Sequence, residues 1–307
     1  MRNKYLFVII ILTITGGRTF CQLVPFQDED AMVTPGFNTD FIHSRKISGI
    51  TISYFTKPDG ARINDDGITK KYFFDTTGKI TGEIDITKTN DGRYDTIKCK
   101  YYYDSLKNIT VRRTEMDNFF DTWYYKWNKD NRVEIEVHVH ETSRATDGEF
   151  KIATQKVIST DSFAYIVYPK QLQQYKYNED NKIFQTTITQ YDDNKRFLSR
   201  NCHYAVGWLY SQVDIKYDAS GRIIGYQNTG NLNGVINHNT TIKYDSLGKI
   251  VEEGIWVDYK QRHHIEYMYE DGLISNKLDR DNEKGVIGII RFSYEMYDTK
   301  GNVGAER

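Results

Sequence analysis

Two histidines separated by a single residue are the strongest candidates for chemistry in this sequence of 307 residues. On a β-strand, His138 and His140 would project from the same face, because side chains two residues apart share a face. Both imidazoles could then reach one zinc ion, with a third ligand from His203, His263 or Glu136. This pattern is compatible with a metal-dependent hydrolase. The alternative interpretation is that the two histidines lie on an ordinary polar sheet face.

Aromatic side chains are the second group that could carry a function. The chain contains 24 Tyr, 15 Phe and 4 Trp residues, and aromatic rings can stack on sugars or grip a peptide. Trp123, Trp208 and Trp256 lie outside the repeated aromatic positions described below. We therefore predict that these three tryptophans contact a ligand, either a protein or a glycan.

Other patterns of catalytic chemistry are not recognisable in the sequence. No serine lies in a nucleophile-elbow pattern, and the cysteines have no catalytic context. The glycines occupy turn-like positions rather than a phosphate-binding loop. We predict no catalytic residue and no cofactor, and an enzymatic activity remains the less favoured hypothesis.

The elements that must position these residues follow from an internal repeat. Nine times an aromatic run stops at an Asp, Asn or Glu, after which a turn and a new apolar run follow. Most of these positions are 24 to 29 residues apart, and they are Asp75, Asp104, Asn128, Asn178, Asp192, Asp218, Asp245, Glu270 and Asp298. Repetition at this period indicates a repeat architecture. The short step from Asn178 to Asp192 suggests a single hairpin without its usual connection.

The residues after each of these positions predict one kind of turn. An Asp side chain accepts hydrogen bonds from the amides ahead of it and starts a type I turn. Three residues later the chain needs a left-handed residue, which is most easily a glycine. This predicts structural turns at Asp75 and Gly78, Asp218 and Gly221, Asp245 and Gly248, and Asp298 and Gly301. Asn131 and Asn181 suit the same offset, whereas Lys107 and Lys195 depart from it.

The segments between the turns have the composition of β-strands. Tyr, Thr, Ile and Val are frequent there, and they suit a pleated, half-buried surface. No long amphipathic helix is evident. The predicted fold is all-β, an antiparallel meander of repeated hairpins that forms an extended, curved or spiralling sheet. We assign residues 71–307 to this repeat domain.

The unit Tyr-Asp-x-x-Gly-Arg/Lys-Ile, clearest at Tyr217–Ile223 and Tyr244–Ile250, resembles the YD repeats of RHS-type bacterial surface and toxin-delivery proteins. The resemblance covers about Tyr72 to Val303. It implies long spiralling sheets of hairpins, which in that family sometimes enclose cargo. The units here are too few for a large shell, and no toxin segment or self-cleaving motif is recognisable. The cargo function is therefore not carried over.

The N-terminal residues read as an export signal. Arg2 and Lys4 precede an apolar stretch that is short for a membrane span, and a cut after Cys21 would remove residues 1–21. Cys21 could instead carry a lipid anchor. Residues 22–70 fit the repeat less well, and we predict a capping segment with a divergent hairpin that turns at Pro58–Gly60.

Charge and cysteine content limit the partners. Removing residues 1–21 takes away three basic residues and no acid, so the formal net charge changes from −1 to −4. This argues against nucleic acid as a partner, and no transmembrane span is predicted after cleavage. Cys99 and Cys202 then remain, either as one disulfide or as two free buried thiols.

The favoured hypothesis is an exported, non-enzymatic β-repeat scaffold that binds a protein or a glycan. It would be periplasmic, associated with the outer membrane, or extracellular. Two alternatives are the metal-dependent hydrolase with a site near His138 and His140, and an accessory component of a polymorphic-toxin system. The second alternative rests only on the YD resemblance.

Overall fold

The computed structural model describes residues 36–297 except 117–118, 147–148 and 232–235. The described part contains one short helix, α1 (Thr39–Ser44), and eighteen strands. The strands are β1 (Ile47–Pro58), β2 (Asn64–Phe74), β3 (Ile80–Lys88), β4 (Tyr94–Tyr103), β5 (Ile109–Met116), β6 (Phe119–Trp127), β7 (Val133–Thr146), β8 (Glu149–Tyr168), β9 (Gln171–Tyr177), β10 (Ile183–Tyr191), β11 (Phe197–Tyr204), β12 (Tyr210–Tyr217), β13 (Ile223–Gly230), β14 (Ile236–Tyr244), β15 (Ile250–Val257), β16 (Lys260–Glu270), β17 (Leu273–Asp281) and β18 (Val286–Met296).

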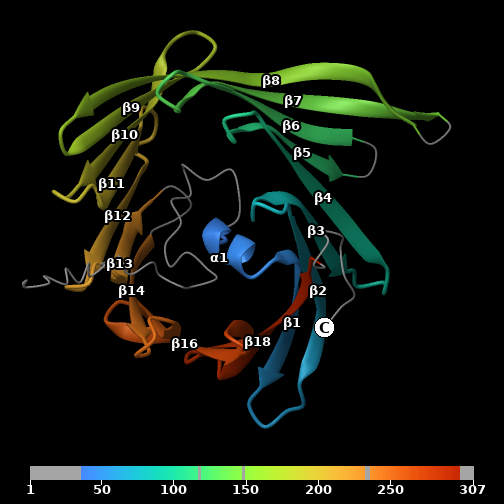
Figure 1. Cartoon of the computed structure of the whole chain (residues 1–307), viewed down its shortest axis with the longest axis vertical. Coiled ribbons are helices and arrows are strands. Elements are labelled where there is room, and N and C mark those ends of the chain that lie inside the picture. Colours follow the sequence, from blue (N-terminus) through green and yellow to red (C-terminus); the bar gives the residue numbers. More distant parts are fainter. Residues whose placement is uncertain (1–35, 117–118, 147–148, 232–235, 298–307) are drawn as a thin grey trace, which may run out of the picture.

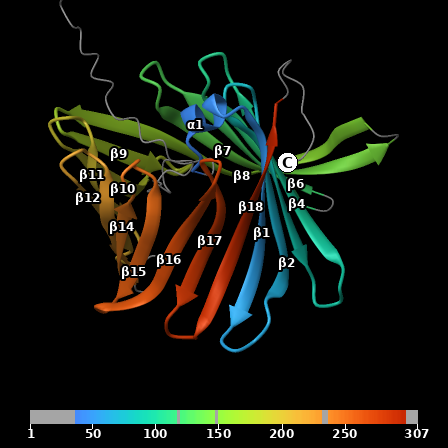
Figure 2. The same ribbon diagram turned by 60° about the horizontal axis from the view of Figure 1, so that its bottom comes forward.

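The strands form an all-β antiparallel meander that closes into a barrel (Figures 1 and 2). Strands that follow one another in the chain pair with each other, and β1 pairs with both β2 and β18. The prediction of an extended, curved or spiralling sheet was therefore wrong, although the antiparallel meander itself is confirmed. The first strand is the closing strand, so it does not cap an open edge.

A recurring β-bulge supplies the curvature that closes the sheet. In six hairpins the pairing register shifts at the last residue of the strand before the turn: Phe74, Tyr103, Trp127, Tyr191, Tyr217 and Tyr244. In a seventh it shifts at Tyr269, the residue before the end of β16. Each bulge bends its strand and increases the local twist. Since the same distortion recurs in successive hairpins, the sheet curls steadily until its edges meet, which removes unpaired edges from the fold.

The turns share one hydrogen-bond pattern. The Asp75 carboxylate accepts from the amides of Thr77 (2.8 Å) and Lys79 (3.0 Å), and the Gly78 amide donates to the Asp75 carbonyl (2.9 Å). The turns that begin at Asp218 and Asp245 have the same bonds. The left-handed φ angles at Gly78, Gly221 and Gly248 are 84°, 83° and 81°.

Residues other than glycine occupy the same left-handed position in four further turns. The φ angles are 59° at Asn131 and Asn181, 72° at Lys107 and 62° at Lys195. Lys107 and Lys195 therefore adopt the left-handed conformation, although they depart from the Gly or Asn that the sequence pattern predicts at this position. The bonds to the preceding Asp hold the turn, and they outweigh the strain of about 1–2 kcal/mol that a side chain meets at positive φ.

The short step between Asn178 and Asp192 has a simple topological cause. The turns that begin at Asp75, Asp104, Asn128, Asp192, Asp218 and Asp245 each join an even-numbered strand to the next odd-numbered one, so they lie at one end of the barrel. The Asn178 turn joins β9 to β10 and therefore lies at the opposite end. A single strand separates it from Asp192.

The aromatic residue that ends many of the strands ties neighbouring hairpins together. The Tyr217 hydroxyl donates to the Phe197 carbonyl (2.6 Å), and the Tyr244 hydroxyl donates to the Ile223 carbonyl (2.7 Å). Equivalent bonds join Tyr103 to Ile80, Trp127 to Ile109 and Tyr269 to Ile250. These bonds give the repeated aromatics a structural function within the barrel wall.

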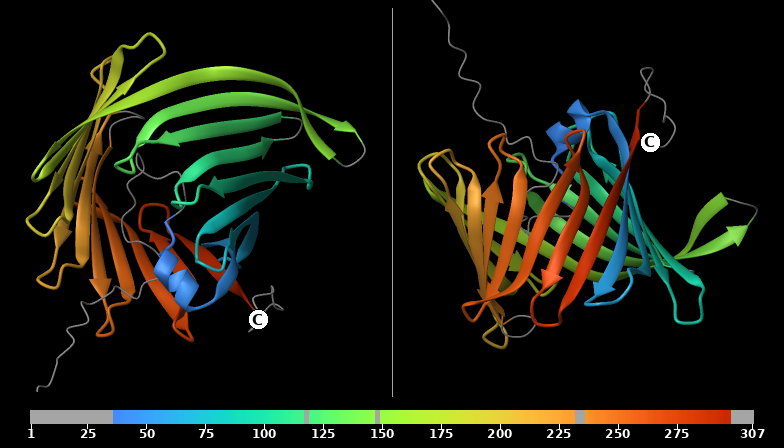
Figure 3. Two further views of the ribbon diagram at one scale, coloured as in Figure 1. Left: turned by 45° about the horizontal axis from the view of Figure 1, so that its top comes forward. Right: turned by 90° about the horizontal axis from the view of Figure 1, so that it is seen from below.

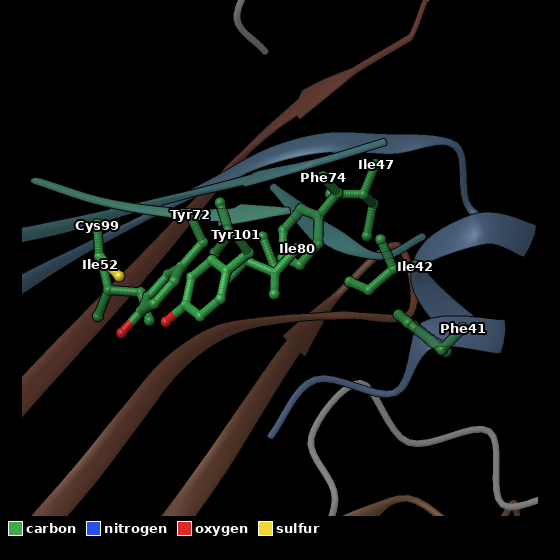
Figure 4. Close-up of a cluster of buried hydrophobic side chains, with 10 residues drawn as sticks. Phe41, Ile42, Ile47, Ile52, Tyr72, Phe74, Ile80, Cys99 and Tyr101 are labelled. Carbon is green, nitrogen blue, oxygen red and sulfur yellow. The ribbon is translucent and has the colours of Figure 1, made fainter. Parts of the chain in front are cut away.

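Helix α1 and its apolar neighbours form the main core. The helix lies inside the ring of strands near one end (Figures 1 and 3). Asn38 caps it by accepting from the Phe41 amide (3.1 Å). Phe41 and Ile42 belong to a buried cluster with Ile50, Phe74 and other side chains of β1–β4 (Figure 4). The rest of the described barrel has a smaller buried cluster around Ile242 and Ile250.

The pairing register separates an inner from an outer face, because residues that pair directly across neighbouring strands share a face. Ile52, in the α1 cluster, is on the inner face and pairs with Lys70, which pairs with Asp85. Lys70 and Asp85 form an ion pair of 2.6 Å. The inner face is thus apolar near α1 and carries charged residues further along the same strands.

Candidate functional site

A depression that could hold a ligand lies over β12–β15. It has a volume of about 510 Å³, and its lining includes Lys216, Gly225, Asn239, Thr241, Trp256 and Tyr259. Gly225 pairs with Thr241, Asn239 pairs with Trp256, and the pairing register puts these four residues on the outer face. We call this depression the Trp256 groove.

One glycine makes room for the groove, and a second makes room for the indole that borders it. Gly225 lies on its floor, and a Cβ atom at this position would lie 2.4 Å from the Thr240 carbonyl oxygen. At Gly254 a Cβ would lie 3.0 Å from the Trp256 Nε1 atom. The indole nitrogen therefore lies directly above the backbone of β15, where any side chain at Gly254 would displace it.

The aromatic wall of the groove is held in place at one point. Trp256 Nε1 donates a long hydrogen bond (3.4 Å) to the Thr241 hydroxyl on the neighbouring strand. Tyr259 follows β15 in a tight connection, has a φ of 62°, and is 98% exposed. The groove thus combines a positioned indole with a fully exposed phenol at its rim.

The other two tryptophans that the sequence singled out lie elsewhere. Trp208 is in the connection between β11 and β12 and is 94% exposed. Trp123 lies on β6, where its ring stacks on His138 (centroids 4.3 Å apart) and beneath the Arg112 guanidinium (4.1 Å). The structure therefore does not bring Trp123, Trp208 and Trp256 together into one site.

His138 and His140 share the inner face of β7, and both approach the same carboxylate. Asp121 Oδ1 lies 3.2 Å from His140 Nδ1 and 3.5 Å from His138 Nε2. Within the described ranges, no group of three or more His, Cys, Asp or Glu side chains is arranged to hold a metal ion. The imidazoles instead contact Asp121, Trp123 and Phe119. In the described residues, none of the expected third ligands His203, His263 and Glu136 completes a metal-binding group with the two histidines.

Further ionisable groups on the inner face pair with each other. Lys176 on β9 lies 3.1 Å from Glu136 and 2.9 Å from Asp161. Burial lowers the pKa of Lys176, but the two carboxylates outweigh it, so its pKa is raised and the ammonium is maintained. On β15, burial raises the pKa of Glu253, while Lys277 and a hydrogen bond from Tyr267 oppose the rise.

One buried carboxylate could not be singled out from the sequence. Glu141 on β7 is completely buried and lies 2.9 Å from Arg113, 2.9 Å from Thr122 and 2.8 Å from Tyr124. It lies on the face opposite to His138 and His140, because it is an odd number of residues away from them. Glu141 therefore links β5, β6 and β7 and takes no part in a histidine site.

Cys99 and Cys202 are both buried, and neither forms a disulfide. They lie on β4 and β11, on opposite sides of the barrel (Figure 1). The disulfide alternative was therefore wrong, because the closed barrel separates the two thiols. The Cys21 anchor site, the segment 1–21 and the Asp298–Gly301 turn lie outside the described residues.

No protein-family model matches the chain, and no curated protein matches it either. Similar solved structures include a porin-like protein from Bacteroides uniformis, with 11% identity and a TM-score of 0.39, covering 82% of this chain and 97% of that one. A porin-like protein from Bacteroides vulgatus has 11% identity and a TM-score of 0.31, covering 81% and 98%. The TcdB2–TccC3–Cdc42 structure has 12% identity and a TM-score of 0.18, covering 78% and 15%. These similarities assign no function to the chain.

Proposed function

We propose that this chain is an exported, non-enzymatic barrel that binds a protein or a glycan on its outer surface. The observation that carries the proposal is the Trp256 groove, where an indole and an exposed phenol border a depression whose lining includes Gly225. Aromatic residues in such positions supply contact area with little loss of conformational entropy on binding.

The continuous strand pairing around the groove supports the proposal of a rigid binding scaffold rather than an enzyme that changes conformation. The strands on both sides of β14 are each paired with two neighbours, and β14 itself pairs with β13 through residues 236–241 and with β15 through residues 238–244. The repeated bonds from Tyr217 and Tyr244 reinforce the same sector. A ligand would therefore meet a surface that is already formed, which reduces the cost of binding.

Charges on the outer face favour contact with water. Lys243 on β14 pairs with Glu252 on β15 (2.8 Å), and Glu266 on β16 lies 3.4 Å from Arg280 on β17. Lipid-facing strands carry an apolar band instead.

In the part of the chain that the structure describes, no helix is long and apolar enough to cross a membrane. We infer an exported protein in the periplasm, at the outer membrane or outside the cell.

The proposal is tested by affinity capture. Mature protein, residues 22–307, is immobilised and exposed to detergent-solubilised envelope of its own source, and bound proteins and glycans are identified by mass spectrometry. We expect an enriched partner that excess free protein displaces and that Trp256→Ala loses, while Trp208→Ala retains it. A partner captured equally by both variants, or none at all, would contradict the proposal.

We also propose that the hairpins are related to the YD repeats of RHS-type proteins. The support is the repeated combination of an Asp-initiated turn, a left-handed third residue and an aromatic hydroxyl bonded to the previous hairpin, as at Asp218, Gly221 and Tyr217. A toxin or secretion gene beside the coding gene would favour an accessory function in such a system, and its absence would count against it.

A further inference from the structure

We propose that the Trp256 groove binds an uncharged sugar ring of an oligosaccharide. This inference deepens the proposed function and rests on it, since it names the ligand class of the same groove. Three features of the groove support it. The groove has an aromatic wall and hydrogen-bonding groups beside that wall, and its lining combines strands that are each paired on both sides with a single cationic side chain.

The aromatic wall suits the apolar face of a sugar. The C–H groups on one side of a pyranose pack against an aromatic ring, and the indole offers the largest such surface among side chains. Trp256 is fixed by its bond to Thr241 (3.4 Å) and by its place above Gly254. Tyr259, at the rim, can contact a second ring of the same chain.

Hydrogen-bonding groups surround that wall. Asn239 and Thr241 on β14 and Lys216 on β12 line the groove, and all three side chains are exposed. An amide, a hydroxyl and an ammonium can together donate to and accept from sugar hydroxyls. The volume of about 510 Å³ is within the usual range of roughly 300–1,000 Å³ for small-ligand sites.

Other ligand classes fit the same surface less well. A peptide that adds as a strand needs an unpaired sheet edge, and β13, β14 and β15 are each paired on both sides. A nucleic acid or a strongly anionic glycan needs several cations, whereas Lys216 is the single cationic side chain in the groove lining. A neutral saccharide requires neither an edge nor a cluster of positive charge.

The test uses isothermal titration calorimetry of the mature chain with three named probes: maltohexaose, cellohexaose and chitohexaose. We expect at least one of them to bind. Trp256→Ala should weaken that binding by about tenfold or more, as expected for a central aromatic contact. Asn239→Ala should weaken it less, because one hydrogen bond is lost.

Matched variants keep the result interpretable. Trp208→Ala removes an exposed tryptophan that lies outside the groove and should leave affinity unchanged. Trp256→Phe preserves an aromatic wall and should retain part of the binding if Trp256→Ala does not fold. The inference is overturned if none of the three probes binds at millimolar concentration, or if Trp256→Ala or Trp256→Phe binds as tightly as the parent. A protein partner in the capture experiment, without saccharide binding here, would overturn this inference and leave the proposed function standing.

Discussion

The turns after β2 and β14 have the same internal structure and very different surroundings. In both, the aspartate carboxylate accepts two backbone amides, and the glycines Gly78 and Gly248 have φ angles of 84° and 81°. Helix α1 covers the first turn, since His43 Nδ1 lies 2.7 Å from the Thr76 carbonyl oxygen. A Cβ at Gly78 would lie 2.2 Å from the Thr39 carbonyl oxygen, whereas one at Gly248 would have nothing within 4 Å.

This difference shows that the repeat and the N-terminal helix stabilise the molecule in separate ways. The repeat gives each turn the same local bonds, so those bonds should be worth the same amount everywhere. The helix adds packing to one sector alone, and that packing has no counterpart at the β14–β15 turn.

The largest effect should follow from weakening the helix contact itself. Ile42 on α1 is completely buried, and Ile42→Ala removes three carbon atoms from the core next to the covered turn. We expect a loss of about 4 kcal/mol in the free energy of unfolding, because such truncations cost the transfer energy plus a cavity. Urea denaturation measures it, and a loss below 1 kcal/mol would show that α1 contributes little.

Glycine substitution in the two turns should separate packing from backbone strain. Gly248→Ala should cost about 1 kcal/mol, which is the strain of a side chain at positive φ. Gly78→Ala meets the same strain plus a clash with the α1 backbone, so we expect about 3 kcal/mol in total. The comparison is made by thermal and urea unfolding of both variants. Equal losses would mean that α1 moves aside freely.

Removing the turn carboxylates should give nearly equal effects. Asp75→Ala and Asp245→Ala each delete two hydrogen bonds from backbone amides, and Asp75→Ala also deletes one from the exposed Thr77 hydroxyl. Each variant should lose about 1.5–3 kcal/mol, the usual range for hydrogen bonds to a charged group. Asp→Asn variants at both positions serve as controls, since the amide oxygen can still accept. Losses that differ by more than 1 kcal/mol would show that the two turns are not equivalent internally.

The smallest effect on stability should come from changing Glu253 on β15, the strand that follows the β14–β15 turn. Its pKa is raised by burial, so the folded protein holds this proton more tightly than the unfolded chain does. The stabilisation is present below the ordinary glutamate pKa of about 4.3 and is lost as pH rises through the raised value. Glu253→Gln should therefore gain stability relative to the parent between pH 4 and pH 8, measured as the difference in Tm. A difference independent of pH would contradict this.

The regular features of the fold could be predicted from the sequence, because each is encoded locally. The Tyr-Asp-x-x-Gly unit determines a turn and two flanking strands, and the antiparallel meander follows from its repetition. Closure could not be predicted, because it depends on the summed curvature of many bulges and on the pairing of Ile47 with Met296, which are far apart in the chain.

The candidate site was only partly predictable. Trp256 stood out as an aromatic residue outside the repeat, but its groove depends on Gly225 and Asn239 from other strands. The alternation rule placed His138 and His140 on one face, yet it could not reveal Asp121, which lies on the neighbouring strand and engages both rings. Pairings between strands, rather than residue types, carried the missing information.

The pairing of β1 with β18 has a consequence for the time course of folding. Thr51 pairs with Ser293, so the closing contacts join residues from the two extremes of the described chain. Local hairpins form quickly, whereas contacts between distant residues carry a larger loop-closure cost and form slowly. We expect the hairpins to assemble progressively and the seam to close last. Until then both terminal strands remain open edges, and the unfinished barrel is most vulnerable to aggregation at that stage.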